Sequence, residues 1–280
     1  MSPAFCWLGE DGVMTRPLLD QVDAYLDAAP RASCTVEEIG PFTLFIGNQG
    51  GWRYYARPRH GADASGVTAA DITAVRQRQR ELGQPEAFEW VDEVAAGVAT
   101  ACRDAGLAVR EHPLLVHHDP LAVPVPNGVR IRRLGADDPA VPASMAVAQV
   151  AFSAMGQPAT GGVTARDEVL AKNDPEAVDF VRRRIADART VVVVAEDERG
   201  VLACGSHNPV GDATEVVGVA TLPDERRRGL GAAVTDTLVA DAVRRGLQVI
   251  LLSAQDDEVA RVYERTGFRR VATAMAAESN

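Results

Sequence analysis

The stretch TEVVGVATLPDERRRGLGA, residues 214–232, decides the fold that we expect for this chain. Its first part, Glu215 to Thr221, is rich in valine and predicts a β-strand. Gly218 interrupts this strand and predicts a bulge or a close approach of another backbone. Pro223 cannot donate a backbone hydrogen bond, so we expect strand pairing to end there.

A helix follows the strand after a short turn. Apolar residues at helical spacing predict that it covers Gly229–Arg245. The first N–H groups of a helix lack intrahelical partners, the helix dipole is positive there, and glycines allow another group to approach closely. The turn therefore predicts a cradle for a phosphate group, with a plain strand-to-helix turn and solvated arginines as the alternative. A P-loop run is absent, and the dinucleotide fingerprint GxGxxG fails because Val234 stands at its last glycine.

Two motifs give the chain a family resemblance. The run RRRGLG at 226–231 resembles R/Q-x-x-G-x-G/A, the acetyl-CoA signature of the GNAT superfamily of N-acetyltransferases, and it follows a strand ending in V-x-x-L-P at Val219–Pro223. The run VYERTGF at 262–268 resembles the family's L-Y-x-x-x-G-F, and a strand expected at Gln248–Ser253 lies between the two motifs. One departure is Asp257, which stands where the family often has asparagine.

The resemblance implies a mixed α/β fold (α+β mixed sheet), the GNAT acyl-CoA N-acyltransferase fold. It implies acetyl-CoA as co-substrate and no metal. The strand of the first motif is expected to splay from its neighbour, so that the pantetheine arm pairs with the free backbone near Val219 and Thr221. The N–H groups from Arg227 to Gly231 would then hold the pyrophosphate. The expected coenzyme-binding residues are Val219, Ala220, Thr221, Arg226, Arg227, Arg228, Gly229, Leu230, Gly231 and Ala232.

Amide formation from a thioester requires a group that accepts a proton from the amine and one that protonates the departing thiolate. By its position in the second motif, Tyr263 is expected to be the general acid, since an ordinary tyrosine pKa of ~10 keeps it protonated at neutral pH. Glu215 is the candidate base: strict alternation would place it on the face of Val217 and Val219, where apolar neighbours raise a carboxyl pKa, although a bulge would change this. His207 and a water chain are the alternatives.

Composition restricts the class of partner. The net charge of -10 and the pI near 5.0 argue against a nucleic-acid surface, and they favour a cationic substrate such as an amine. No run approaches ~18 apolar residues and the start resembles no signal peptide, so we expect no membrane contact. The four cysteines form no C-x-x-C pair, which is typical of a reducing cytoplasm. We therefore expect a cytoplasmic protein with a small-molecule amine acceptor; a homodimer is compatible with this.

A proline-rich segment divides the chain. Residues 121–128 read as an extended linker between an N-terminal domain, 1–120, and a catalytic domain, 129–280. In the N-terminal domain, a helix is predicted at Asp92–Ala105 and a strand at Leu107–Val116, broken at Pro113. The order of its elements repeats that of the C-terminal half, which predicts a tandem protein with a partial first GNAT-like copy. An unrelated α/β lid is the alternative.

The sequence thus predicts an acetyl-CoA-dependent N-acetyltransferase that transfers an acetyl group to a primary amine by direct attack in a ternary complex. A non-catalytic acyl-CoA-binding or sensing protein and an enzyme that acetylates proteins are the alternatives. No metal site is expected, because the histidines at 112, 117 and 118 lie in a proline-broken segment without fixed ligand geometry.

Overall fold

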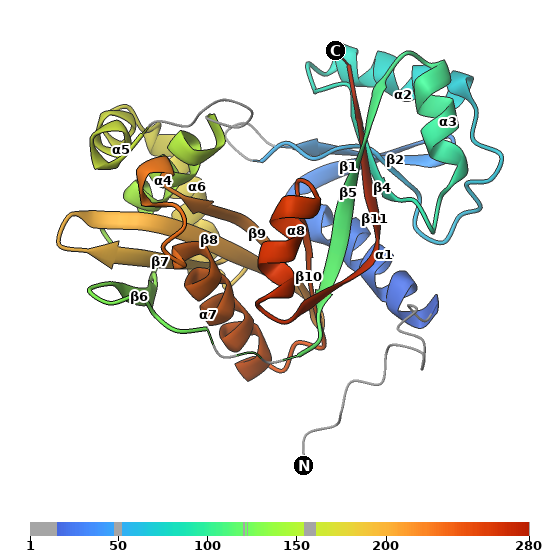
Figure 1. The fold of residues 1–280 in the computed structure, drawn as a ribbon. Coiled ribbons are helices and arrows are strands. Elements are labelled where there is room, and N and C mark those ends of the chain that lie inside the picture. The colour runs from blue at the N-terminus through green and yellow to red at the C-terminus, as the bar shows by residue number, and fades with distance from the viewer. Residues whose placement is uncertain (1–15, 48–51, 120, 122, 154–160, 280) are drawn as a thin grey trace. The chain divides into compact units, whose positions relative to one another are not determined.

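The computed structural model describes residues 16–279 except 48–51, 120, 122 and 154–160 (Figure 1). The chain forms two compact units. The first comprises residues 1–118, 253–261 and 269–280, and the second comprises residues 119–252 and 262–268. The first boundary lies next to the expected linker, whose described residues form neither helix nor strand. The sequence predicts a single domain over residues 129–280, whereas in the structure residues 269–280 group with the first unit.

The first unit combines helices with two groups of strands. A three-stranded antiparallel sheet has the order β1-β2-β3, and β4, β11 and β5 are neighbours in that order in a second sheet. Strand β11 pairs antiparallel with β4, which explains why the C-terminal strand belongs to this unit. Its elements are α1 (Arg16–Arg31), β1 (Cys34–Ile39), β2 (Phe42–Gly47), β3 (Arg57–Pro58), α2 (Ala69–Glu81), β4 (Ala87–Val91), α3 (Gly97–Asp104), β5 (Ala108–His117) and β11 (Phe268–Glu278).

An apolar core joins these elements. Phe42 of β2 and Phe88 of β4 meet edge to face with ring centroids 5.3 Å apart. Residues of α2, α3 and β11 complete the same buried cluster, including Ile72, Val98 and Met275. This unit therefore has a core of its own.

Two expectations for the first unit differ from the structure. The helix begins at Gly97 rather than at Asp92, because Asp92 N donates to Thr273 O of β11 and the Glu93 carboxylate accepts from Thr273 N, so residues of β11 hold this segment in a turn. Strand β5 is continuous through Pro113, whose carbonyl still accepts a hydrogen bond from Ala254 N. Proline removes a donor but leaves its acceptor in place.

The second unit is built on five strands in the order β10-β9-β8-β7-β6. The four strands from β6 to β9 are antiparallel, and β10 is parallel to β9. The run Val191–Ala195 of β7 is buried on both faces, as its continuous apolar sequence predicts. The elements are β6 (Arg130–Arg133), α4 (Val141–Ser153), α5 (Val163–Leu170), α6 (Pro175–Ala186), β7 (Val191–Asp197), β8 (Gly200–Val210), β9 (Ala213–Thr221), the 3₁₀ turn η1 (Pro223–Glu225), α7 (Leu230–Arg244), β10 (Val249–Ser253) and α8 (Asp257–Glu264), of which residues 262–264 belong to this unit.

Helices α7 and α4 lie on opposite faces of this sheet (Figure 1). On β8, Cys204 Sγ donates to the carbonyl of Ser144 in α4. At the next residue, a Cβ on Gly205 would lie 3.0 Å from Val234 and 3.1 Å from Leu238 of α7, so the missing side chain lets this helix approach closely. Because successive residues of a strand point to opposite faces, the two contacts assign one helix to each face.

The mixed α/β architecture that the sequence predicts is confirmed. Across the described residues, no helix has the length and apolar character needed to span a bilayer.

Candidate functional site

Strand β9 has a free edge in its second half. Its pairing with β10 covers only Ala213, Thr214 and Glu215, whereas its pairing with β8 continues to Thr221. Among the described residues, the β10 side of 216–221 therefore has no strand partner. An unpaired strand edge is a template for another extended chain. This is the splay that the sequence resemblance implies.

The direction of the backbone shows which residues serve this edge. Leu222 N donates to Leu202 O of β8 at 3.0 Å, so the amide of Leu222 points toward β8. Backbone groups alternate along a strand, which turns the amides of Val219 and Thr221 the other way, toward the free edge. These are the two residues that the sequence resemblance assigns to pantetheine.

A bulge at Gly218 changes which side chains share a face. Cys204 pairs with Ala220 but Ser206 pairs with Val217, so Gly218 and Val219 together oppose Gly205. Gly218 has φ +63°, the left-handed conformation of a glycine bulge. The bulge expected from the sequence is confirmed.

The bulge places Glu215 on the α4 face. Thr214 faces α7, because it bonds His207, which bonds Asp241 of α7. Val219 also faces α7, since a Cβ on Gly231 would lie 3.7 Å from it. Thr214 and Val219 are five residues apart, so in a regular strand their side chains would lie on opposite faces of the sheet. The extra residue of the bulge places both on the α7 face. Glu215 therefore shares a face with Val217 but not with Val219. This differs from strict alternation along the strand, which would place all three residues on one face.

The β9–α7 turn has an unusual backbone. Arg227 has φ +63° and Gly229, the N-cap of α7, has φ +81°, both in the left-handed region. No side chain caps this helix, and the first helical bond runs from Ala233 N to Gly229 O. The N–H groups of the first turn are thus not satisfied within the helix. Left-handed residues in such a turn form anion-binding concavities, and the positive helix end adds to the attraction.

The three arginines of the turn have different surroundings. Arg226 donates to the carbonyl of Ala151, in the last turn of α4, at 3.3 Å. Arg228 forms an ion pair with Glu225. Arg227 is exposed, and none of the contacts among the described residues involves its side chain. Of the three guanidinium groups, that of Arg227 is the one most available to a phosphate.

Tyr263 lies in the last turn of α8. Its ring meets Phe268 edge to face with centroids 6.0 Å apart, and burial raises the pKa of its phenol to about 12. The phenol consequently stays protonated across the physiological pH range.

His207 does not fit the role of base. Its side chain is fully buried on the α7 face, with Nδ1 2.9 Å from Thr214 Oγ1 and Nε2 3.2 Å from the Asp241 carboxylate. Burial lowers its pKa, against the opposing effect of Asp241. Both ring nitrogens are engaged, so His207 is a structural residue and cannot serve an acceptor on the other face.

Sequence reasoning missed two groups of polar residues near the site. Asn208 lies directly opposite Glu215 on the neighbouring strand, and it accepts a hydrogen bond from Thr190 at 2.7 Å. Arg199, in the turn between β7 and β8, reaches Glu225. The sequence gives no signal for the second contact, which spans 26 positions.

Comparisons with known proteins show what the chain is similar to. Residues 188–270 match the family model described as an acetyltransferase (GNAT) domain. The C-terminal part of the chain carries a GNAT acetyltransferase domain. The matched segment includes the free edge of β9, the left-handed turn and Tyr263, so the features described above belong to this domain.

Solved structures extend the likeness of fold to nearly the whole chain. A GCN5-related N-acetyltransferase from Kribbella flavida is 22% identical, covering 94% of this chain and 95% of that one, with a TM-score of 0.68. A putative acetyltransferase of the GNAT family from Novosphingobium aromaticivorans is 18% identical over 95% of this chain and 100% of that one, with a TM-score of 0.55. A tandem GNAT protein from the clavulanic acid biosynthesis pathway is 17% identical over 85% and 78%, with a TM-score of 0.52. No curated protein matches the chain in sequence.

Proposed function

We propose that this chain is an acetyl-CoA-dependent N-acetyltransferase that transfers an acetyl group to a primary amine by direct attack in a ternary complex. The observation that carries the proposal is the free edge of β9, which leads directly into the uncapped start of α7. An extended pantetheine arm would pair with the amides of Val219 and Thr221. The pyrophosphate would lie against the N–H groups of the turn from Arg227 to Ala232, where a helix N-terminus binds anions.

Glu215 is suited to accept the proton of the amine. It lies on the α4 face of β9, opposite Asn208 and next to Leu251 of β10, where pairing between β9 and β10 ends. A carboxylate at this position is adjacent to the place where the acetyl end of an arm along the free edge would lie. The protonated amine first gives one proton to the carboxylate, and its neutral nitrogen then attacks the thioester carbon. As the amide forms, this nitrogen releases a second proton to water.

Tyr263 is suited to protonate the leaving group. As the C–S bond breaks, the sulfur gains the bonding electron pair, and the phenol donates a hydrogen bond and then its proton to it. The raised pKa keeps the proton on Tyr263 until negative charge develops on the sulfur. No covalent enzyme intermediate is needed, because the amine attacks the thioester directly.

One observation favours a second function. The family's asparagine is replaced by Asp257, whose carboxylate is exposed and bonds Arg270 at 3.0 Å. A non-catalytic acyl-CoA-binding or sensing protein is therefore the alternative.

Calorimetric titration of acetyl-CoA tests the binding step. We expect a micromolar Kd for the wild type and no binding for the Gly229→Asp/Gly231→Asp double variant, because carboxylates would occupy the anion cradle. Gly106→Asp is the control: Gly106 has the same φ of +81° as Gly229 and no heavy atom near the position of its Cβ, but it follows α3. This control should bind normally.

A panel of primary amines, assayed by release of free thiol, tests the catalytic step. Turnover of at least one amine that is lost in Tyr263→Phe supports the enzyme. Binding of acetyl-CoA without turnover across the panel favours the sensing protein, and a wild type that binds no acyl-CoA refutes both functions.

A further inference from the structure

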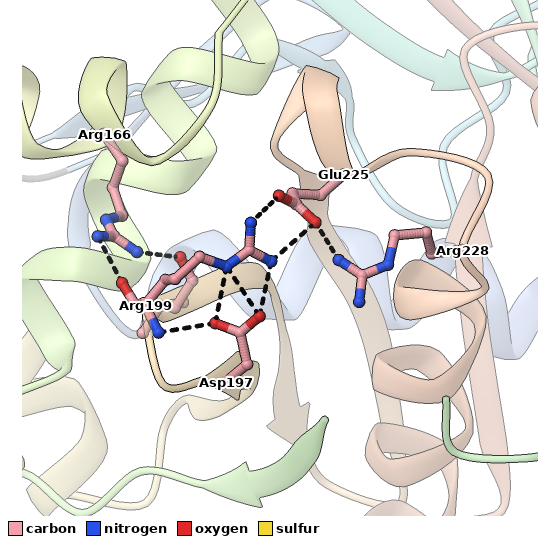
Figure 2. Close-up of polar contacts among 6 residues, drawn as sticks. Arg166, Asp197, Arg199, Glu225 and Arg228 are labelled. Atoms are coloured by element: carbon pink, nitrogen blue, oxygen red, sulfur yellow. Dashed lines mark hydrogen bonds and ion pairs between the residues drawn. The ribbon is translucent and has the colours of Figure 1, made fainter. Parts of the chain in front are cut away.

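An ion-pair network joins the β7–β8 hairpin to the turn that precedes α7. Arg199 occupies the tight turn between β7 and β8, and Figure 2 shows its guanidinium between two carboxylates. Asp197 accepts from Arg199 Nη2 at 2.6 Å and from the backbone N of the same arginine at 2.8 Å. The Asp197 side chain is 6% exposed, so the contact leaves the arginine little freedom.

The other side of the guanidinium holds Glu225. Arg199 Nη1 lies 2.7 Å from Oε1 of Glu225 and Nη2 lies 3.2 Å from Oε2, a bidentate contact of the kind that fixes both partners in orientation. The Glu225 side chain is 9% exposed and pairs in addition with Arg228. Its pKa is held below the ordinary value, mainly by the hydrogen bond from Arg199. A buried carboxylate of this kind depends on its cationic partners.

The hairpin itself is fixed from helix α5. Arg166 is buried and donates to the carbonyls of Val201 and Arg199, each at 2.8 Å (Figure 2). Both main-chain and side-chain atoms of Arg199 are therefore held. The network begins at α5, passes through the hairpin and ends at the third arginine of the RRRGLG run.

The turn needs such support because its backbone is strained. Arg228 lies between two residues in left-handed conformations, and one of these, Arg227, has a side chain. A non-glycine residue in this region costs of order 1 kcal/mol and persists where the surroundings determine it. The Glu225–Arg228 pair is the contact that fixes Arg228 against the preceding η1 turn.

We propose that Arg199 is a positioning residue for the coenzyme: by holding Glu225, and through it Arg228, it fixes the turn in the form that binds the pyrophosphate. The proposal rests on the proposed function of this turn. The Arg228 side chain thereby has a structural role, and only the backbone N–H of this residue faces the pyrophosphate. Without Arg199, the turn samples other conformations, and coenzyme binding must select the competent one.

The test compares Arg199→Gln with Arg103→Gln, which removes an exposed arginine of α3 far along the chain. If the competent turn falls to about one tenth of the population, the Kd for CoA measured by calorimetry rises about tenfold. The KM for acetyl-pantetheine, which lacks the pyrophosphate, stays unchanged in a turnover assay. Arg199→Lys keeps the charge but loses the planar fork, so an intermediate Kd is expected.

Amide hydrogen exchange of residues 226–232, measured without coenzyme, gives an independent readout. We expect faster exchange in Arg199→Gln than in Arg103→Gln. We also expect that adding Arg199→Gln to a Glu225→Gln variant has no further effect on the Kd for CoA, because both changes break one chain of contacts.

Three results would overturn the proposal: an unchanged Kd for CoA in Arg199→Gln, equal losses for CoA and acetyl-pantetheine, or unchanged amide exchange in the turn. A wild type that binds no CoA would instead refute the proposed function. If Arg199→Gln fails to fold, Arg199→Lys carries the same comparison.

Discussion

Two glycines of the RRRGLG run, two residues apart, should respond in opposite ways to the same added methyl group. Gly229 has φ +81°, and a Cβ there would lie 3.9 Å from Pro126, so the added atom finds room but the backbone is unfavourable. Gly231 lies within the first turn of α7, and its Cβ would make ordinary contacts of 3.5 Å with Thr221 and 3.7 Å with Val219. Gly229→Ala is therefore expected to destabilise the fold and Gly231→Ala to stabilise it.

The magnitude follows from the backbone alone. A left-handed alanine costs about 1–2 kcal/mol, and alanine in place of glycine in a helix gains up to about 1 kcal/mol. The two variants should thus differ by about 2–3 kcal/mol. At about 2–4 °C per kcal/mol for a domain of this size, their Tm values should be separated by roughly 4–12 °C.

Differential scanning fluorimetry measures this separation, and calorimetry with acetyl-CoA measures its consequence for binding. In Gly229→Ala, backbone strain displaces the N–H groups of the turn. Each ~1.4 kcal/mol of binding free energy lost in this way raises the Kd for acetyl-CoA about tenfold. Gly106→Ala is the matched control, because Gly106 has φ +81° and open space around its Cβ position. It should lower Tm in the same way and leave the Kd unchanged.

The reasoning is refuted if Gly231→Ala lowers Tm as much as Gly229→Ala. Equal Kd values for Gly229→Ala and the wild type, together with a lowered Tm, would show that coenzyme does not depend on the conformation of this turn.

The remaining predictions concern proton transfer and burial. Tyr263→Phe should lower kcat about 100-fold or more while leaving the Kd for acetyl-CoA unchanged, and an unchanged kcat in steady-state assays would exclude the acid role. Glu215→Gln should lower kcat/KM and remove the acidic limb of its pH profile; the same limb in both proteins would exclude the base role. His207 has a lowered pKa in the folded chain, so below its ordinary value of about 6.5 the unfolded chain binds more protons, and the free energy of unfolding falls as pH falls through that window. Urea denaturation at pH 7.5 and 5.5 should show a lower free energy of unfolding at pH 5.5 for the wild type and a smaller decrease for His207→Asn. Asp241, whose pKa is also lowered, affects stability only below about pH 4 and so does not contribute to this difference.

The sequence predicts the second unit well because its signals are local. A valine-rich strand, a proline, a glycine at a helix start and helical periodicity place β9 and α7 to within two residues at each end. The bulge at Gly218 is likewise predicted by a residue type. The face on which the bulge places Glu215 is known only from the pairing of β9 with β8, and the local sequence does not give this pairing.

Predictions that depend on distant contacts were less complete. The helix expected from Asp92 begins at Gly97, because β11, about 180 residues later, holds the preceding segment. The C-terminal strand belongs to the first unit for a related reason, its pairing with β4. The Arg199–Glu225 contact joins two turns that β8 and β9 bring together, and charge patterning along the chain does not indicate it.

A comparison of two strand edges shows why the free edge of β9 points to binding. In the first unit, β4 pairs with β11, and on its other side Ala56 donates to Ala87 O and accepts from Glu89 N at 3.0 and 2.9 Å. The chain itself thus fills that position with an extended segment of its own. Backbone groups left without partners are costly when buried, so a fold leaves a strand edge open only where water or a ligand satisfies it. At β9 the open edge leads to a turn with two left-handed residues and an uncapped helix start, and an extended ligand with a phosphate group at one end would match both features.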